Sequence, residues 1–285
     1  MRPERTKLLY LAPALAWIFA MVLFPLFYTI GISFFNYTLG GETEFNYGLN
    51  YLTAVQDYRF WNGLKVSAVF TVVVVSIEFL LGLGLALLLS GRMRGRRTLR
   101  LIMLMPLFAC PIAVGYLYLM IFHQRGPVNA FLSLLGFVQM PNWLGDPSLT
   151  LFTVGFVDVW GWTSFMFLIL LAAIESLPVE LYEAAQIDGA SGWLKFRKLT
   201  FPMLIPAILI ALALRITDAF KIFDIFVGLT KGGPGISTEV YSMYVYRVTL
   251  EYFKFGYSGA LSVIFLLIMM AAINVLFLFR RLRKW

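Results

Sequence analysis

The stretch Glu183-Ala-Ala-Gln-Ile-Asp-Gly189 lies in the one long polar break between the fourth and fifth apolar segments of the chain. Alanine favours a helix there, and Asp188-Gly189 ends it, because glycine accepts the left-handed conformation that follows a helix. Ser191 can cap a second helix over residues 192–199, and Leu199-Thr-Phe-Pro202 leads back into an apolar segment. The sequence therefore predicts two short helices around a turn, a compact protrusion that can fit a groove on a partner.

Composition places the chain in a membrane. It has 285 residues, of which 60% are hydrophobic and 13% charged, and its mean hydropathy is +0.82. Soluble domains carry about 25% charged residues, and a spanning helix needs about 20 mostly apolar residues. Because backbone groups in lipid must be satisfied within the segment, we expect an all-α, polytopic membrane protein, a single transmembrane domain over 1–285 with six transmembrane helices. The expected spans are residues 8–35, 64–89, 101–122, 150–174, 204–226 and 258–279.

The distribution of Lys and Arg predicts the orientation. Fifteen of the 23 flank the spans on one side, at the two termini, around residues 92–100 and in the loop that contains Glu183. Both termini and this loop are therefore expected in the cytoplasm, and the loops 36–63, 123–149 and 227–257 on the outer side. The net charge of +8 needs no nucleic-acid partner, because anionic headgroups of the lipid bilayer favour basic residues beside a membrane.

The sequence contains no recognisable motif for catalysis, for nucleotide binding or for a metal site. Gly232-Gly-Pro-Gly235 lacks the Lys-Ser/Thr of a phosphate-binding loop, and it predicts a turn. His123 has no neighbouring Cys or carboxylate cluster, and Cys110 is the single cysteine, so neither a metal site nor an internal disulfide is expected. We therefore expect no catalytic residue, no metal and no cofactor in this chain.

Several motifs resemble those of one family. Nine residues separate Gly189 from Leu199, with Phe201-Pro202 directly after Thr200, and with the E-A-A sequence this resembles the cytoplasmic coupling loop (the "EAA loop") of permease subunits in ABC importers. The likeness covers nearly the whole chain and departs at Phe201, where the family usually has Leu. Further motifs are similar to the sugar-type branch of the family: Pro25, Ile187-Asp-Gly-Ala190, Thr230-Lys-Gly-Gly-Pro234, Thr238, Tyr246 and Phe255-Gly-Tyr257.

The resemblance implies the type I ABC importer permease fold. It implies a subunit of an ATP-driven, binding-protein-dependent carbohydrate importer in a bacterial or archaeal inner membrane. The implied partners are a second six-span permease, an ATP-binding cassette ATPase dimer that holds ATP and Mg, an extracytoplasmic solute-binding protein and the carbohydrate, which the sequence does not name. The residues implied in coupling to the ATPase are Glu183, Ala184, Ala185, Asp188, Gly189 and Pro202.

Polar and aromatic groups inside the spans mark a candidate substrate pathway, because polar groups in a membrane tend to face the bundle interior or a water-filled cavity. Asp218, Lys221 and Asp224 are three residues apart and are expected on one helical stripe. The stripe is either a structural ion-pair ladder or inter-subunit contact, or a set of groups that hydrogen-bond the substrate. The full set of pathway candidates is Glu78, Tyr116, Asp158, Trp160, Trp162, Phe220, Lys221, Asp224 and Asn274.

Three other functions remain open at this point. An ion-driven secondary transporter could use the Asp218/Lys221/Asp224 stripe as a relay, although such folds tend to have internal repeats and none is recognisable between the halves of this sequence. An ABC importer permease for a non-sugar solute would keep the same loop. A membrane-embedded enzyme would need a catalytic cluster, which the sequence lacks.

Overall fold

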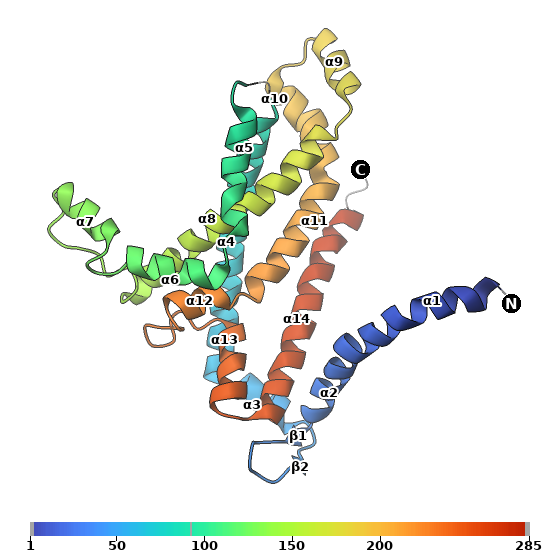
Figure 1. Ribbon diagram of the computed structural model, residues 1–285, viewed down its shortest axis with the longest axis vertical. Coiled ribbons are helices and arrows are strands. Elements are labelled where there is room, and N and C mark those ends of the chain that lie inside the picture. Colours follow the sequence, from blue (N-terminus) through green and yellow to red (C-terminus); the bar gives the residue numbers. More distant parts are fainter. Residues whose placement is uncertain (1–2, 92, 283–285) are drawn as a thin grey trace. The chain divides into compact units, whose positions relative to one another are not determined.

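The computed structural model describes residues 3–91 and 93–282 of the chain (Figure 1). Apart from one hairpin, whose two strands have two residues each, and one isolated β-bridge, the regular structure in these ranges is helical. In this hairpin, β1 (Phe35–Asn36) pairs antiparallel with β2 (Glu44–Phe45). The α-helices are α1 (Pro3–Ile18), α2 (Phe24–Ile32), α3 (Leu49–Gln56), α4 (Tyr58–Ser90), α5 (Arg96–Leu104), α6 (Pro111–Ile121), α7 (Pro127–Leu134), α8 (Pro147–Glu175), α9 (Val179–Ile187), α10 (Gly192–Lys195), α11 (Phe201–Phe220), α12 (Asp224–Leu229), α13 (Tyr241–Tyr246) and α14 (Phe255–Leu282).

The described residues form two compact units whose segments alternate along the chain. Unit 1 contains residues up to 61 together with 244–272, and unit 2 contains residues 62–243 together with those from 273 onward. Unit 1 therefore holds α1, α2, the hairpin, α3 and most of α14, whereas unit 2 holds α5 to α12 and nearly all of α4. The loop that contains Gly189 and the charged residues Glu78, Asp158, Arg215, Asp218, Lys221 and Asp224 all lie in unit 2.

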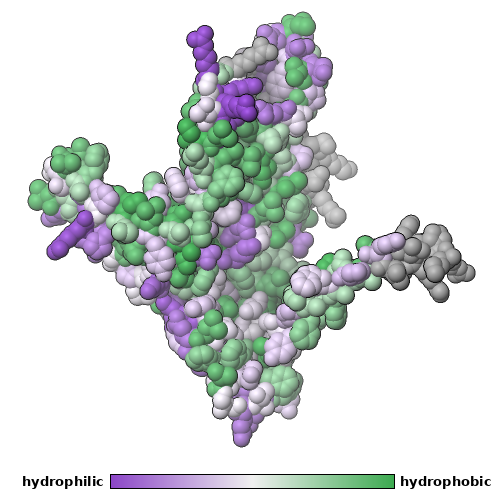
Figure 2. All heavy atoms as spheres, in the orientation of Figure 1, coloured by the Kyte–Doolittle hydropathy of each residue, from purple (hydrophilic) through white to green (hydrophobic). Residues whose placement is uncertain are grey.

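Five helical segments are long and apolar enough to cross a membrane, and a bent pair of helices makes a sixth. Hydrophobic residues cover much of the surface that Figure 2 shows, as expected for helices whose outer faces meet acyl chains rather than water. The five are Tyr10–Ile32, Tyr58–Ser90, Pro147–Glu175, Gly192–Leu229 and Phe255–Leu278, and the bent pair is Arg96–Phe108 with Pro111–Ile121.

The helix expected over residues 101–122 is broken. Its two halves meet at an angle of 96°, and Ala109 and Cys110 between them have extended backbone. Pro111 explains the extended Cys110, because a proline disfavours the helical conformation of the residue before it. The prediction of one straight helix over residues 101–122 is therefore wrong, because the segment consists of two helices joined at a sharp bend.

The helix expected over residues 204–226 is also interrupted. It ends at Phe220, and α12 begins only at Asp224. The carbonyl of Ile222, which lies in the break, accepts a hydrogen bond of 2.5 Å from the Ser242 hydroxyl. A residue twenty positions away thus stabilises the break. The local sequence around residues 221–223 does not predict this contact.

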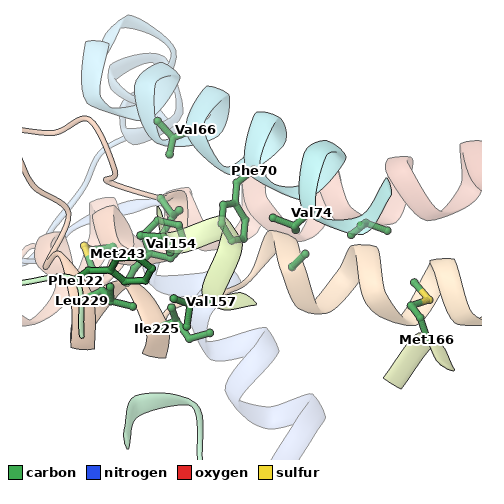
Figure 3. Close-up of a cluster of buried hydrophobic side chains, with 14 of the residues drawn as sticks. Val66, Phe70, Val74, Phe122, Val154, Val157, Met166, Ile225, Leu229 and Met243 are labelled. Atoms are coloured by element: carbon green, nitrogen blue, oxygen red, sulfur yellow. The ribbon is translucent and has the colours of Figure 1, made fainter. Parts of the chain in front are cut away.

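A hydrophobic cluster forms the core of unit 2 (Figure 3). Its side chains come from α4, α8, α11 and α12, with Phe122, Val240 and Met243 beside them. The labelled members are Val66, Phe70 and Val74 of α4, Val154, Val157 and Met166 of α8, and Ile225 and Leu229 of α12, together with Phe122 and Met243. Packing of this kind holds these helices at fixed distances, which positions the charged residues that they carry.

Helices α4 and α8 approach closely at Gly82. A Cβ atom at this position would lie 2.6 Å from the Cβ of Met166 and 3.0 Å from the backbone nitrogen of Phe167. Small residues allow this kind of close helix contact in membranes. Gly84, one residue further along the same helix, has nothing within 4 Å of an added Cβ.

We predict that Gly82→Ala destabilises the protein by about 1–3 kcal/mol, because an added methyl group in a packed contact forces the helices apart. Gly84→Ala is the matched control on the same helix. It should be neutral or stabilising by up to about 1 kcal/mol, since alanine is the better helix former. Thermal unfolding of the purified protein in detergent measures both, and equal stabilities for the two variants would contradict the close contact.

Candidate functional site

The predicted turn at Gly189 is present and has the hydrogen bonds of a Schellman motif. Gly189 has a φ of +73°, a left-handed conformation that glycine adopts without strain. The N–H of Ala190 donates to the carbonyl of Ala185 at 2.9 Å, and the N–H of Gly189 donates to Gln186 at 3.1 Å. These bonds satisfy the last carbonyls of α9 and fix the direction in which the chain leaves it.

The second helix begins at Gly192 with Ser191 as its cap, as predicted, but it does not end near residue 199. The Ser191 hydroxyl accepts a hydrogen bond from the N–H of Leu194 at 3.3 Å and caps α10. The helix continues through a π-helical turn, Phe196–Thr200, directly into α11. The Tyr182 hydroxyl lies 2.9 Å from the Thr200 hydroxyl, so α9 is tied to the base of α11.

The loop formed by α9, Gly189 and α10 is exposed on the surface of unit 2, and α9 projects beyond the end of α5 (Figure 1). Large apolar side chains are exposed on this loop: Ile187 is 87% exposed and Trp193 is 69% exposed, and Val179, Leu181 and Leu194 are exposed as well. Exposed apolar area of this kind indicates a site for a protein partner. Of the residues expected to couple, Glu183, Ala184, Asp188 and Gly189 are exposed, and Ala185 and Pro202 are half-buried.

A cluster of three charged residues lies inside unit 2. Arg215 of α11 donates from Nε to Glu78 Oε2 at 2.6 Å and from Nη2 to Glu78 Oε1 at 2.8 Å. The same Nη2 donates to Asp158 of α8. All three side chains are fully buried, and the guanidinium lies 4.7 Å from the ring centroid of Trp162. The two-pronged contact with Glu78 is the geometry in which Arg–carboxylate pairs are strongest.

The sequence shows each of these charges but not their pairing. Glu78 and Asp158 were expected on a substrate pathway, and the structure engages both with Arg215. A direct role of these two carboxylates in the pathway stays a prediction. The signal that could have linked them is depth, because all three lie near the middle of their predicted spans, and opposite charges at one depth in lipid tend to pair.

A cavity of about 230 Å³ adjoins this cluster. The break between α11 and α12 forms one wall, so the expected helical stripe is wrong in part: Lys221 Nζ lies 2.8 Å from Asp218 Oδ1, but Asp224 starts the next helix. Among the described residues, Arg215 Nη1 and Asp158 Oδ1 are buried without a hydrogen-bond partner. The polar and aromatic residues that line the cavity are Trp162, Arg215, Asp218, Lys221, Phe223 and Asp224.

The remaining pathway candidates are spread over unit 2. Trp160 and Trp162 line a second cavity of about 160 Å³, and the ring of Trp160 packs edge-on against Tyr118. Phe220 is buried at the end of α11, whereas Tyr116 and Asn274 are exposed. Contact of these residues with a substrate stays a prediction.

Known proteins share this fold. A chain in the crystal structure of a bacterial ABC transporter involved in the import of the acidic polysaccharide alginate superposes with a TM-score of 0.85 at 22% identity, over 99% of this chain and 98% of that chain. The chain therefore has the all-α, polytopic fold of a type I ABC importer permease.

Relatives with known names show the family. The trehalose/maltose transport system permease protein MalF of Thermococcus litoralis is 38% identical over 93% of this chain and 89% of the relative. The lactose transport system permease protein LacF of Rhizobium radiobacter is 30% identical over 93% and 90%. Residues 78–282 match the family model described as binding-protein-dependent transport system inner membrane component. The chain belongs to this family, so it is a multi-pass transport subunit of an inner membrane.

We predict that Arg215→Met destabilises unit 2 by about 3–5 kcal/mol, because it leaves two buried carboxylates without their counter-charge. Arg97→Met, at an exposed arginine of α5, is the control and should change stability by no more than about 0.5 kcal/mol. Adding Glu78→Gln and Asp158→Asn to Arg215→Met should recover part of the loss. Thermal unfolding in detergent measures the series, and a stable Arg215→Met single variant would show that the cluster does not hold the helices.

Proposed function

We propose that this chain is one transmembrane subunit of an ATP-driven importer that receives a carbohydrate from a solute-binding protein. The observation that carries the proposal is the exposed helix–turn–helix at Gly189 in a member of this permease family. The two relatives given above are named as permeases of trehalose/maltose and lactose transport systems. Their names support a carbohydrate as the substrate.

The loop formed by α9 and α10 is the proposed contact with the ATPase. Glu183 offers a carboxylate to a basic group, and the exposed Ile187 and Trp193 offer apolar area to a groove on the partner. Because α10 continues through the turn at Phe196–Thr200 into α11, a displacement of the loop moves α11 with it. ATP and Mg belong to the partner ATPase in this proposal, and this chain binds no cofactor.

The proposed assembly contains a second six-span permease, an ATPase dimer and the binding protein on the outer side. Both termini lie in the cytoplasm, in accordance with the excess of Lys and Arg on that side. Closure of the ATPase dimer and docking of the loaded binding protein both favour the outward-facing state. This shared preference is the differential affinity that coupling requires.

The cavity beside the buried cluster is the proposed part of the sugar pathway in this chain. Trp162 supplies an aromatic face, and Lys221 and Asp224 supply a donor and an acceptor. Glu78 and Asp158 are satisfied mainly by Arg215, so we assign them the role of holding Arg215, which lines the cavity. The position of the cavity at the end of α11 places it on the helix that the coupling loop moves.

We predict that Gly189→Pro uncouples transport from ATP hydrolysis. Proline fixes φ near −65° and cannot adopt the φ of +73° that this turn requires. Sugar uptake should fall by about tenfold or more, while the assembled complex still hydrolyses ATP. Sugar uptake and ATP hydrolysis are both measured with the complex in proteoliposomes. Glu183→Lys should have the same effect, because it reverses the charge at the proposed contact with the ATPase.

The control for this variant is Gly192→Pro. Gly192 is the first residue of α10, directly after the cap Ser191, and proline is favoured at that position. This variant should keep both activities. Normal uptake by Gly189→Pro, or equal loss in both proline variants, would contradict the proposed role of the turn.

The test of the function itself is the ATPase activity of the reconstituted complex with its binding protein, measured against a panel of sugars. We predict stimulation by a sugar-loaded binding protein. Stimulation only by a non-sugar solute would move the substrate outside carbohydrates. Uptake that follows a proton or sodium gradient and needs no ATP would favour a secondary transporter instead.

A further inference from the structure

We propose that unit 1 contains a carbohydrate-binding site of its own, in a cavity between the hairpin segment, α3 and the start of α14. The ligand class rests on the proposed function, but the site lies apart from the cavity of unit 2. The segments that build it, residues 36–59 and 244–257, are those predicted to lie on the outer side, where the cargo of an importer arrives.

The cavity has a volume of about 400 Å³, within the range of about 300–1,000 Å³ that small-molecule sites occupy. Its lining alternates aromatic and polar groups, and four of its twelve lining residues are tyrosines. The lining residues that offer aromatic faces or polar groups to a ligand include Asn36, Tyr37, Thr38, Tyr252, Lys254 and Tyr257. Aromatic faces next to amide, hydroxyl and ammonium groups are what a sugar ring requires, since its C–H face is apolar and its rim carries hydroxyls.

One wall of the cavity is fixed by Asp57. Tyr244 donates a hydrogen bond to its carboxylate, Tyr257 donates at 2.9 Å and the N–H of Arg59 donates at 2.8 Å. Burial opposes ionisation of Asp57, but these hydrogen bonds hold its pKa below the ordinary value. Burial and the bond to this carboxylate raise the pKa of Tyr244, so its hydroxyl keeps the proton. Arg59 Nη1 donates to the Tyr252 hydroxyl at 2.8 Å, so three tyrosine side chains are held in place.

The segments that line the cavity are also joined by backbone contacts of the Phe255-Gly-Tyr257 motif. The N–H of Gly256 donates to the carbonyl of Tyr37 at 3.0 Å, and a Cβ atom at Gly256 would lie 2.0 Å from the carbonyl oxygen of Phe35. Only glycine permits this contact. Phe253 has a φ of +54°, which is rare outside glycine. Such residues persist where the surrounding structure holds them, and they cluster at functional sites. The strained turn places Lys254 at the rim of the cavity.

Several polar groups in this cavity are not used by the fold. Among the described contacts, the side chains of Asn36, Thr38 and Lys254 have no hydrogen bond or ion pair, and the Tyr37 hydroxyl has none either. They supply donors and acceptors to a ligand. An isolated anion is a poorer occupant, because the ionised Asp57 lines the same cavity and Arg59 is already engaged by Tyr252. The unused donors and the fixed aromatic rings therefore favour a neutral polyhydroxy ligand.

The test is protection of an introduced cysteine by sugar. Cys110 is the single cysteine, so Cys110→Ala gives a cysteine-free background. Thr38→Cys is then labelled with a membrane-impermeant methanethiosulfonate reagent, in the complete permease–ATPase complex in lipid nanodiscs without the binding protein. We expect saturating maltose, trehalose or lactose to slow the labelling severalfold. Thr43→Cys, an exposed position of the same loop outside the cavity, is the matched control and should be labelled at an unchanged rate.

A second variant links the protection to Lys254. In the Thr38→Cys background, Lys254→Met should raise the sugar concentration needed for half-protection by about tenfold, the loss expected for one hydrogen bond from a charged donor. Lys65→Met, at an exposed lysine outside this cavity, should leave that concentration unchanged. Equal effects of the two variants would overturn the assignment of Lys254.

The outcomes separate the site from the proposed function. Stimulation of the ATPase by a sugar-loaded binding protein, with no protection of Thr38→Cys by any sugar, overturns the site alone. Protection without stimulation supports the site and overturns the importer. Labelling that is already slow without sugar in phosphatidylglycerol nanodiscs, but fast in phosphatidylcholine nanodiscs, shows that a lipid headgroup occupies the cavity and overturns the sugar ligand.

Discussion

The ion pair of Arg215 with Glu78 and Asp158 is the interaction on which unit 2 depends. It joins α4, α8 and α11 at one point inside the protein, where each charge alone would carry a large desolvation cost. The hydrophobic cluster around Phe70 and Val157 packs the helices, but apolar contacts in a membrane lack the driving force that they have in water. A buried polar contact gives the three helices one arrangement, because any displacement leaves a charge without its partner.

The helix that carries Arg215 is continuous with the exposed loop around Gly189. From the cap Ser191, the chain runs through the short helix α10 and a π turn into α11. Helix α11 ends at the cavity that Lys221 and Asp224 line. One continuous element thus connects the exposed protrusion with the interior of unit 2. The Schellman turn at Gly189 fixes the direction in which the chain leaves α9, and the contact between Tyr182 and Thr200 ties α9 to the base of α11.

Unit 1 has a different construction, in which backbone and tyrosine hydrogen bonds replace the ion cluster. Asp57 and the motif Phe255-Gly-Tyr257 hold segments that are almost 200 residues apart in the sequence. The close contact at Gly256 and the positive φ of Phe253 lie beside the polar cavity. The side chains of Asn36 and Lys254 at this cavity are exposed, so solvent or a ligand can take their hydrogen bonds.

The sequence by itself determined the membrane class, the approximate spans, and the cap, turn and second helix around Gly189, because these depend on local composition and on single residues with strong conformational preferences. It also showed that Glu78, Asp158 and Arg215 lie inside spans. Only the tertiary structure decided that these three pair, that α11 stops at Phe220, and that Gly256 packs on Tyr37. Each of these depends on groups brought together from distant parts of the chain, such as Ser242 at the helix break, and local sequence carries no record of such contacts.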